Sequence, residues 1–204
     1  AASMGPDGAL LEALLEVDRE DGSLLGSYEK PAGVYLFAGG SLLRVEDNIV
    51  YRLEEEWEVM MTAEGTIEDF ARGDDTWWTL GQDGMVRKYN SGFVKVGEAS
   101  SRFPEGEVIP GERFVVVAGP GGYEVFDEET LERVSGDDVV NNRILLSGDK
   151  VVAAGEEGLE VRNGYTGKVI WREEGDFRKA VTSGEKLYAL IRGRVYAFEG
   201  AGNI

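Results

Sequence analysis

The stretch GDKVVAAG at residues 148–155 carries the pattern that decides the fold: a glycine, a short polar step and then a run of apolar residues. From Gly39 onward, stretches of this kind begin 34, 38, 37 and 36 residues apart. The other four copies are GGSLLRV from Gly39, GDDTWWTL from Gly73, GERFVVVAG from Gly111 and GEKLYALI from Gly184. Repeats of that length, made of short strands, predict β-propeller blades or a solenoid.

Residues 150–184 form the clearest unit. Residues 151–154 are continuously apolar and predict an inner strand, because a strand buried on both faces needs no polar alternation. Residues 159–163 alternate and predict a second strand, and the turn GYTG at 164–167 leads to a third strand at 168–172. Residues 177–182 would complete the blade. The same pattern fits residues 113–149, 75–112 and 40–73, so four complete four-stranded units are predicted, and a fifth ends two strands short.

The segment LEVRNGYTGKVIW at residues 159–171 resembles the pyrroloquinoline-quinone-type, or quinoprotein-like, β-propeller repeat. It is similar to that family's second strand, Thr-Gly-Lys turn and docking tryptophan, and residues 15–25 and 123–131 are weaker copies. The resemblance implies an all-β propeller. The family's quinone-dependent dehydrogenases use paired cysteines and an acidic calcium site, and this chain has no Cys and no Asp-x-Asp cluster. The dehydrogenase activity is therefore not expected.

Counting residues predicts how the ring closes. The 20 residues after Gly184 are too few for a blade, and residues 24–39 would supply its third and fourth strands. The prediction is a propeller of five four-stranded blades over residues 24–204, in which both termini share the last blade and leave no open edge. A six-bladed alternative would need two strands from residues 1–23, where only one apolar run occurs.

Residues 1–23 are then a surplus N-terminal arm. Five apolar residues are the interaction residues predicted there: Leu10, Leu11, Leu14, Leu15 and Val17. Their spacing favours a short amphipathic helix that begins after Asp7, whereas LLEVDREDGSLL resembles a propeller hairpin. The arm is thus a helix that caps the ring, a redundant strand, or a segment donated to a neighbouring subunit.

Composition excludes several classes of function. A net charge of −18 argues against binding nucleic acid or anionic membrane surfaces. The absence of Cys and His removes disulfides, thiolate nucleophiles and the commonest zinc ligands. No apolar run approaches the roughly 20 residues that cross a bilayer. Because the chain starts at Ala1, we expect that a preceding segment was removed, unless Met4 is the start. Depletion of Cys and Gln with abundant Glu is typical of thermophiles.

Carboxylates are the only plentiful groups that could catalyse a reaction. Glu46, Asp83 and Glu156 are the candidates near the central funnel, with Arg192 at the matching position of the last unit. They occur singly in turns, which is typical of solvated surface acids. Residues 18–23 hold acids beside a glycine but lack the spacing of a calcium loop. We therefore predict no catalytic residue, no cofactor and no metal, and no enzymatic activity.

The four tryptophans are predicted to pack between blades: Trp57, Trp77, Trp78 and Trp171. Trp77 and Trp78 are adjacent on one strand, so their side chains should point to opposite faces. A sugar-stacking role for either is the alternative.

The sequence favours a non-catalytic propeller that binds other proteins, most simply copies of itself, as a subunit of an extracellular filament or surface structure. The alternative function is a carbohydrate-binding or glycoside-processing propeller that uses its central funnel. An extracellular or cell-surface location is favoured, and a cytoplasmic scaffold is the weaker alternative.

Overall fold

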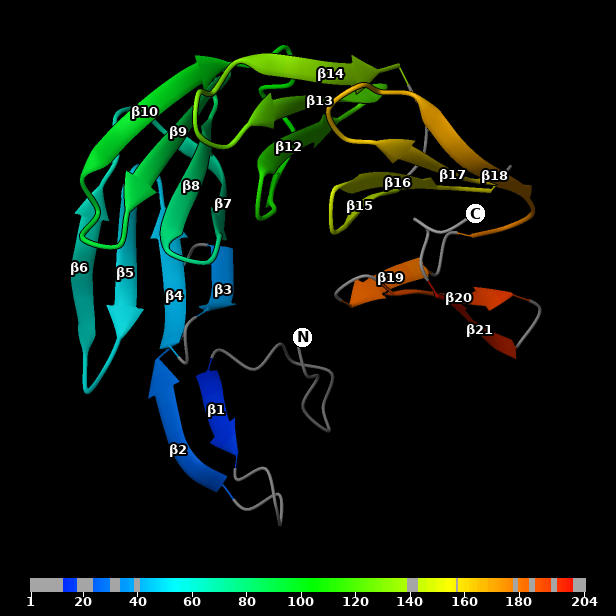
Figure 1. Cartoon of the computed structure of the whole chain (residues 1–204). Coiled ribbons are helices and arrows are strands. Elements are labelled where there is room, and N and C mark those ends of the chain that lie inside the picture. Colours follow the sequence, from blue (N-terminus) through cyan, green and yellow to red (C-terminus); the bar gives the residue numbers. More distant parts are fainter. Residues whose placement is uncertain are drawn as a thin grey trace. The chain divides into compact units, whose positions relative to one another are not determined.

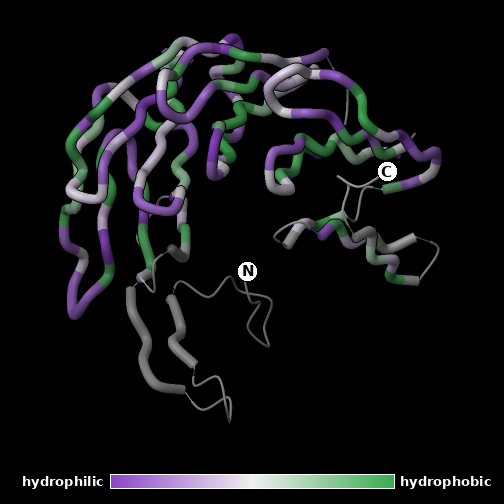
Figure 2. Tube along the Cα trace, in the orientation of Figure 1, coloured by the Kyte–Doolittle hydropathy of each residue, from purple (hydrophilic) through white to green (hydrophobic). Residues whose placement is uncertain are grey.

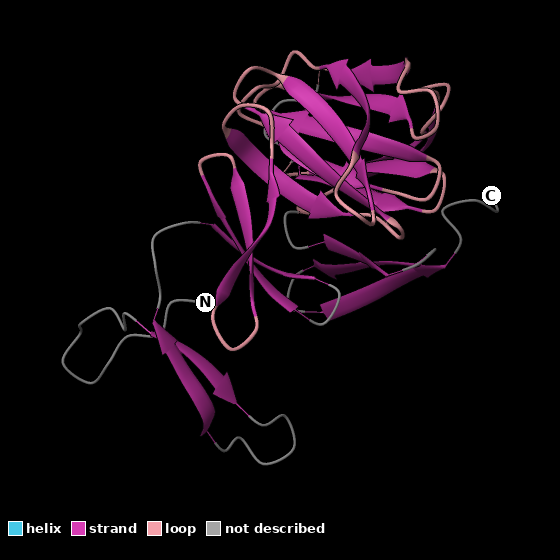
Figure 3. Ribbon diagram, turned by 90° about the vertical axis from the view of Figure 1, so that its left-hand side faces the viewer, coloured by secondary structure: helices cyan, strands magenta, loops and turns pink. Residues whose placement is uncertain are grey.

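The computed structural model describes residues 13–17, 24–29, 34–38, 41–138, 143–156, 158–177, 180–183, 186–191 and 194–199. In this part of the chain every regular element is a β-strand, and no helix occurs, as Figure 3 shows. The chain divides into two compact units, Ala1–Val34 and Tyr35–Ile204. In the described part of the chain no helical segment has the length and hydropathy that crossing a membrane requires.

The first unit contains an antiparallel pair of strands, β1 (Ala13–Val17) and β2 (Leu24–Glu29). Ala13 lies opposite Glu29, and the register shifts between Glu16 and Val17. Residues 13–17 are thus a strand and not the helix that the apolar spacing favoured; Leu10 and Leu11 lie outside the described residues. The strand alternative, in which this region resembles a propeller hairpin, describes the residues better.

Four antiparallel four-stranded sheets follow along the chain (Figure 1). In each sheet the strands are ordered as in the sequence, which is the arrangement of a propeller blade. The first comprises β3 (Val34–Ala38), β4 (Ser41–Glu46), β5 (Ile49–Leu53) and β6 (Trp57–Thr62). The second comprises β7 (Ile67–Arg72), β8 (Thr76–Gly81), β9 (Met85–Asn90) and β10 (Lys95–Ser100).

The third sheet comprises β11 (Glu107–Pro110), β12 (Phe114–Gly119), β13 (Gly122–Asp127) and β14 (Arg133–Asp137). The fourth comprises β15 (Arg143–Ser147), β16 (Lys150–Ala154), β17 (Gly158–Asn163) and β18 (Val169–Glu174). The last sheet has three strands among the described residues: β19 (Ala180–Ser183), β20 (Lys186–Ile191) and β21 (Arg194–Glu199).

The predicted blades were displaced by one strand. The apolar runs expected to be inner strands are the second strands β4, β8, β12 and β16, and the strand predicted to end each unit begins the next sheet. The first strands of neighbouring sheets lie against each other, β7 against β11 and β15 against β19. A second strand is paired on both edges and covered on both faces, so Val115, Val116 and Val117 are all fully buried. Burial on both faces was predicted correctly; the position in the sheet was not.

The predicted shared last blade is also corrected. Of residues 24–39, β2 pairs with β1, and β3 adjoins β4 in the first sheet. Since β3 belongs to the sheet of β4, β5 and β6, residues 34–38 are not the fourth strand of the blade formed by β19–β21. The prediction placed residues 24–39 and the C-terminal strands in one blade because their lengths together match one repeat. A residue count does not specify which strands pair.

Consecutive sheets pack face to face through four hydrophobic clusters. These clusters lie between sheets 1 and 2, 2 and 3, 3 and 4, and 4 and 5, and are called the first to fourth junctions. The largest side chains of these clusters include Trp77 at the first junction, Trp78 at the second, Phe114 at the third and Phe177 at the fourth. Hydrophobic and hydrophilic segments alternate along the chain (Figure 2), because each blade buries both faces of its middle strands and exposes its turns.

Candidate interaction surface

The predicted catalytic acids lie in different sheets. Glu46 ends β4 and pairs with Arg44 at 3.3 Å, Asp83 lies in the turn between β8 and β9, and Glu156 is exposed in the turn after β16. Arg192 lies outside the described residues. Among the described residues no three Asp or Glu side chains gather in a way that could hold a metal ion. The structure therefore does not bring the three candidate acids Glu46, Asp83 and Glu156 together.

Three of the four tryptophans pack at junctions between sheets, and Trp57 contacts residues of the first sheet. Trp77 stacks on Phe70 and Phe93 at the first junction, with ring centroids 5.2 and 5.3 Å apart. Trp78 is fully buried at the second junction, on the opposite face of β8. Trp171 packs against the cluster at the fourth junction. Trp57 lies in the first sheet, edge-on to Tyr35 and beneath the Arg44 guanidinium.

A buried charge recurs at one position of the blade that the sequence analysis did not single out. The third residue of β9, β13 and β17 is Arg87, Glu124 and Glu160, respectively, and each is at most 9% exposed. Each makes an ion pair with the fourth strand of its own sheet. Other contacts of the same cluster reach the preceding sheet, or the connection between that sheet and its own. A buried charge without a partner is strongly destabilising, so each partner set matters for folding.

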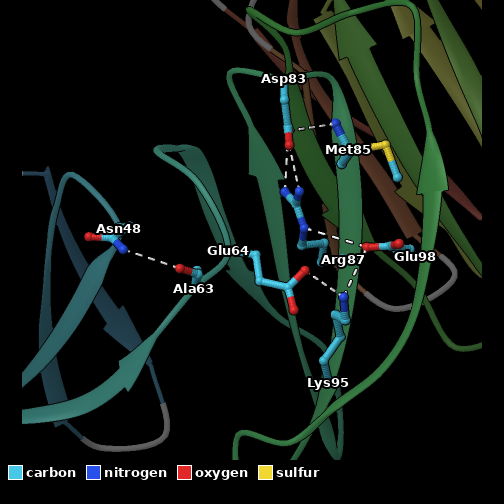
Figure 4. Close-up of polar contacts among 8 residues, drawn as sticks. All are labelled: Asn48, Ala63, Glu64, Asp83, Met85, Arg87, Lys95 and Glu98. Carbon is cyan, nitrogen blue, oxygen red and sulfur yellow. Dashed lines mark hydrogen bonds and ion pairs between the residues drawn. The ribbon is translucent and has the colours of Figure 1, made fainter.

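Figure 4 shows the Arg87 cluster. Arg87 donates to Asp83, and its Nε lies 3.7 Å from Glu98 on β10. Lys95 bridges Glu98 at 3.1 Å and Glu64, in the connection from the first sheet, at 2.6 Å. The hydrogen bond from Arg87 holds the pKa of Asp83 below its usual range. The cluster thus ties one blade to the connection before it.

Glu124 and Glu160 play the same part at the next two junctions. Glu124 accepts hydrogen bonds from Ser101 Oγ at 2.9 Å and from the Arg102 backbone N–H at 3.0 Å, both directly after β10. Glu160 is paired with Arg162 and Arg172, and Arg162 reaches Asp137 of the third sheet. Burial raises the pKa of Glu160, but the hydrogen bonds from the two arginines outweigh it and lower the pKa overall. These charged side chains therefore connect neighbouring blades through ion pairs and hydrogen bonds.

Two carboxyl groups on neighbouring first strands form the remaining acidic pair. Asp69 on β7 accepts a hydrogen bond from the Val108 backbone N–H at 2.6 Å, which places it beside Glu107 on β11. Burial raises the pKa of Asp69, and burial followed by the charge of Asp69 raises the pKa of Glu107. No sequence pattern predicts this pair, because its members belong to different repeats.

Exposed apolar side chains lie along the sheet edges. On the fourth strands they include Val59, Val96 and Val169, with exposed fractions of 61%, 55% and 39%. Each of these strands pairs with its third strand through a register shift. A β-bulge of this kind twists an edge and discourages further strand pairing.

Strand β21 is a different kind of edge. It pairs with β20 from Lys186–Glu199 to Ile191–Arg194 without a shift, as third strands pair with second strands in the other sheets. No fourth strand adjoins it among the described residues. Its Val195 is 72% exposed and Tyr196 44%, whereas Leu159 at the position of Val195 in β17 is 1% exposed. An unpaired, regular, apolar strand edge is a template for another strand.

The predicted interaction residues lie in the other unit. Leu14, Leu15 and Val17 belong to β1, and β1 and β2 form a two-stranded sheet. A two-stranded hairpin is marginally stable by itself in water, so it generally needs a partner surface.

Three solved structures are similar to this chain. BamB from Moraxella catarrhalis matches over 100% of this chain and 74% of its own, with a TM-score of 0.64 and 15% identity. The computationally designed Ika8 protein matches over 87% and 62%, with a TM-score of 0.63 and 15% identity. KlHsv2 with loop 6CD replaced by a Gly-Ser linker matches over 93% and 73%, with a TM-score of 0.69 and 12% identity.

No protein-family model matches the sequence, and no curated protein is significantly similar to it. Likeness at 12–15% identity shows the fold alone. Sheets ordered as in the sequence, packed face to face and similar to these structures, identify the chain as a protein of the β-propeller fold.

Proposed function

We propose that this propeller is a non-catalytic assembly protein that binds copies of itself. The observation that carries the proposal is the regular edge of β21, beside which the described part of the chain places no fourth strand, with Val195 and Tyr196 exposed. Three other sheets end in a bulged fourth strand, which discourages further pairing, and among the described residues no such strand lies beside β21. A contact between this edge and a different surface of a second copy is heterologous and propagates into filaments unless the rotation closes a ring.

The charge of the chain sets the conditions for association. At a net charge of −18, copies of the chain repel each other electrostatically. Salt weakens this repulsion, because charges farther apart than the Debye length, about 10 Å at 0.1 M ionic strength, are largely screened. Association should therefore strengthen as salt rises from low to moderate concentration. The extracellular or cell-surface location stays a prediction from the sequence.

Sedimentation velocity over a range of concentrations tests the proposal, with two matched variants. Val195→Asp places a charge on the open edge, and Val96→Asp makes the same change on the bulged edge of β10, where the valine is also more than half exposed. We expect the unchanged chain and Val96→Asp to associate with concentration, and Val195→Asp to stay monomeric. A chain that is monomeric throughout, or two variants that associate equally, would refute the proposal.

A second function is supported by Asp69 and Glu107, the neighbouring carboxyl groups of raised pKa. Glycoside hydrolases pair a protonated acid with a second carboxylate, so the alternative is a propeller that processes or binds carbohydrate. A panel of aryl glycosides tests it: hydrolysis that Glu107→Gln abolishes would support this alternative, and the absence of turnover would leave the assembly function.

A further inference from the structure

We infer that the first junction contains a binding site for one buried water molecule, formed by Thr79, Arg87 and Tyr89. These residues lie on β8 and β9, and each is more than nine-tenths buried. Tyr89 belongs to the hydrophobic cluster between sheets 1 and 2. The site therefore lies inside the core, where polar groups are normally hydrogen-bonded.

Strand pairing places the three side chains on one face of the second sheet. Thr79 on β8 lies opposite Arg87 on β9, and Tyr89 follows Arg87 by two residues. Residues two apart on a strand point to the same face. Trp77 lies opposite Tyr89 and belongs to the same cluster, so this is the face that packs in the first junction.

Each of the three side chains has a buried polar atom without a hydrogen-bond partner among the described residues. These atoms are Thr79 Oγ1, Arg87 Nε and Tyr89 Oη. Burial raises the pKa of Tyr89, and the neighbouring Thr79 hydroxyl offsets part of this rise. Arg87 Nε lies 3.7 Å from the Glu98 carboxylate (Figure 4), which is too long for a direct hydrogen bond. Because an unsatisfied buried polar group is costly, three such atoms on one face indicate a bound molecule that they share.

The chemistry of the three atoms selects a neutral molecule. Arg87 Nε–H can only donate, so it disfavours a cation. An anion would meet the Glu98 carboxylate, and the Arg87 guanidinium already donates to Asp83. Water can accept hydrogen bonds from Arg87 Nε–H and the Tyr89 O–H and donate one to Thr79 Oγ1. A buried water typically makes about three hydrogen bonds.

A crystal structure of the full chain, at a resolution that shows ordered water, tests the site directly. We expect one water peak within hydrogen-bond distance of Thr79 Oγ1, Arg87 Nε and Tyr89 Oη. A direct hydrogen bond between the two hydroxyls, with no peak beside them, would overturn the inference. So would a peak that gains anomalous signal when bromide replaces chloride, because the site would then hold a halide ion.

Isosteric variants test the same site by stability. Thr79→Val and Tyr89→Phe each remove a hydroxyl and keep the shape of the side chain. If both hydroxyls bind the water, each variant should lower the ratio of folded to unfolded chain about 2- to 10-fold in urea unfolding. The double variant should lose less than the product of the two, because both groups bind one molecule. Unpartnered hydroxyls predict the opposite sign: their removal would leave the ratio unchanged or raise it.

Relaxation dispersion of the water oxygen-17 nucleus counts long-lived bound waters in solution. The double variant should hold one fewer than the unchanged chain. The matched control is Tyr165→Phe, which removes a hydroxyl that donates directly to the Arg113 carbonyl oxygen at 3.0 Å and should leave the count unchanged. Equal counts in the double variant and the unchanged chain would overturn the inference. Neither result depends on self-association, so failure here leaves the proposed function standing.

Discussion

The fourth and fifth sheets have the same strand order but opposite exposure. In the fourth, Leu159 and Val161 on β17 are fully buried between β16, β18 and the next sheet. In the fifth, Val195 and Ala197 at the matching positions of β21 are exposed. The residues are apolar in both sheets, so the difference comes from what lies beside them. A blade of this protein is complete only when a fourth strand and a following sheet cover its third strand.

The largest effect should separate these two positions. Leu159→Ala removes a side chain that is 1% exposed, and the transfer and cavity terms together should lower the free energy of unfolding by about 2–5 kcal/mol. Val195→Ala, at 72% exposure, should change it by less than about 0.5 kcal/mol in the monomer. Urea unfolding followed by tryptophan fluorescence measures both. Similar losses at the two positions would show that β21 is already covered in the single chain.

The next effect concerns the third residue of these strands. Glu160 is buried and paired with Arg162 and Arg172, whereas Tyr196 at the same position is partly exposed. Glu160→Gln removes the charge from a site built around it and should cost about 1–3 kcal/mol. Tyr196→Gln should cost much less. If both substitutions had the same small effect, the ion pairs between blades would contribute nothing to stability.

The pH dependence should be smaller and should differ in sign between two carboxyl groups. The pKa of Glu160 is lowered in the folded state, so its contribution is present above the ordinary value of 4.5 and is lost as pH falls through the folded value. The pKa of Asp69 is raised by burial, so its ionisation destabilises the fold as pH rises above 3.8. Glu160→Gln should reduce the loss of stability as pH falls below 4.5. Asp69→Asn should reduce the loss of stability as pH rises above 3.8. Unfolding curves at a series of pH values would contradict this if neither slope changed.

The repeat predicted the sheets because a strand's alternation is local. Residues 159–163 alternate and form β17, and the run at 151–154 is buried on both faces as expected. The phase of the blade could not be predicted, since an apolar run reports burial and not which neighbour lies on which edge. The helix expected from Leu10 to Val17 competed with a strand, and in residues 13–17 pairing with β2 prevailed over helical spacing.

The site was less accessible to sequence reasoning. A charge at the third residue of β9, β13 and β17 was visible as a repeat, but charged residues in alternating strands ordinarily face water, so Arg87, Glu124 and Glu160 gave no reason to expect burial. Asp69 and Glu107 come together only because β7 lies against β11. The open edge of β21 became evident from counting strands in the structure.

Amide hydrogen exchange along β21 tests the central claim most directly. The claim is that this strand has one unpaired edge in the single chain and is paired when copies associate. At concentrations where the chain is monomeric, the amides of β21 that do not bond to β20 should exchange rapidly, whereas those of β17 should be protected. At concentrations where it associates, the β21 amides should become protected, with those of β10 unchanged. Exchange in β21 that is already slow in the monomer, or that stays fast in the assembly, would contradict the account.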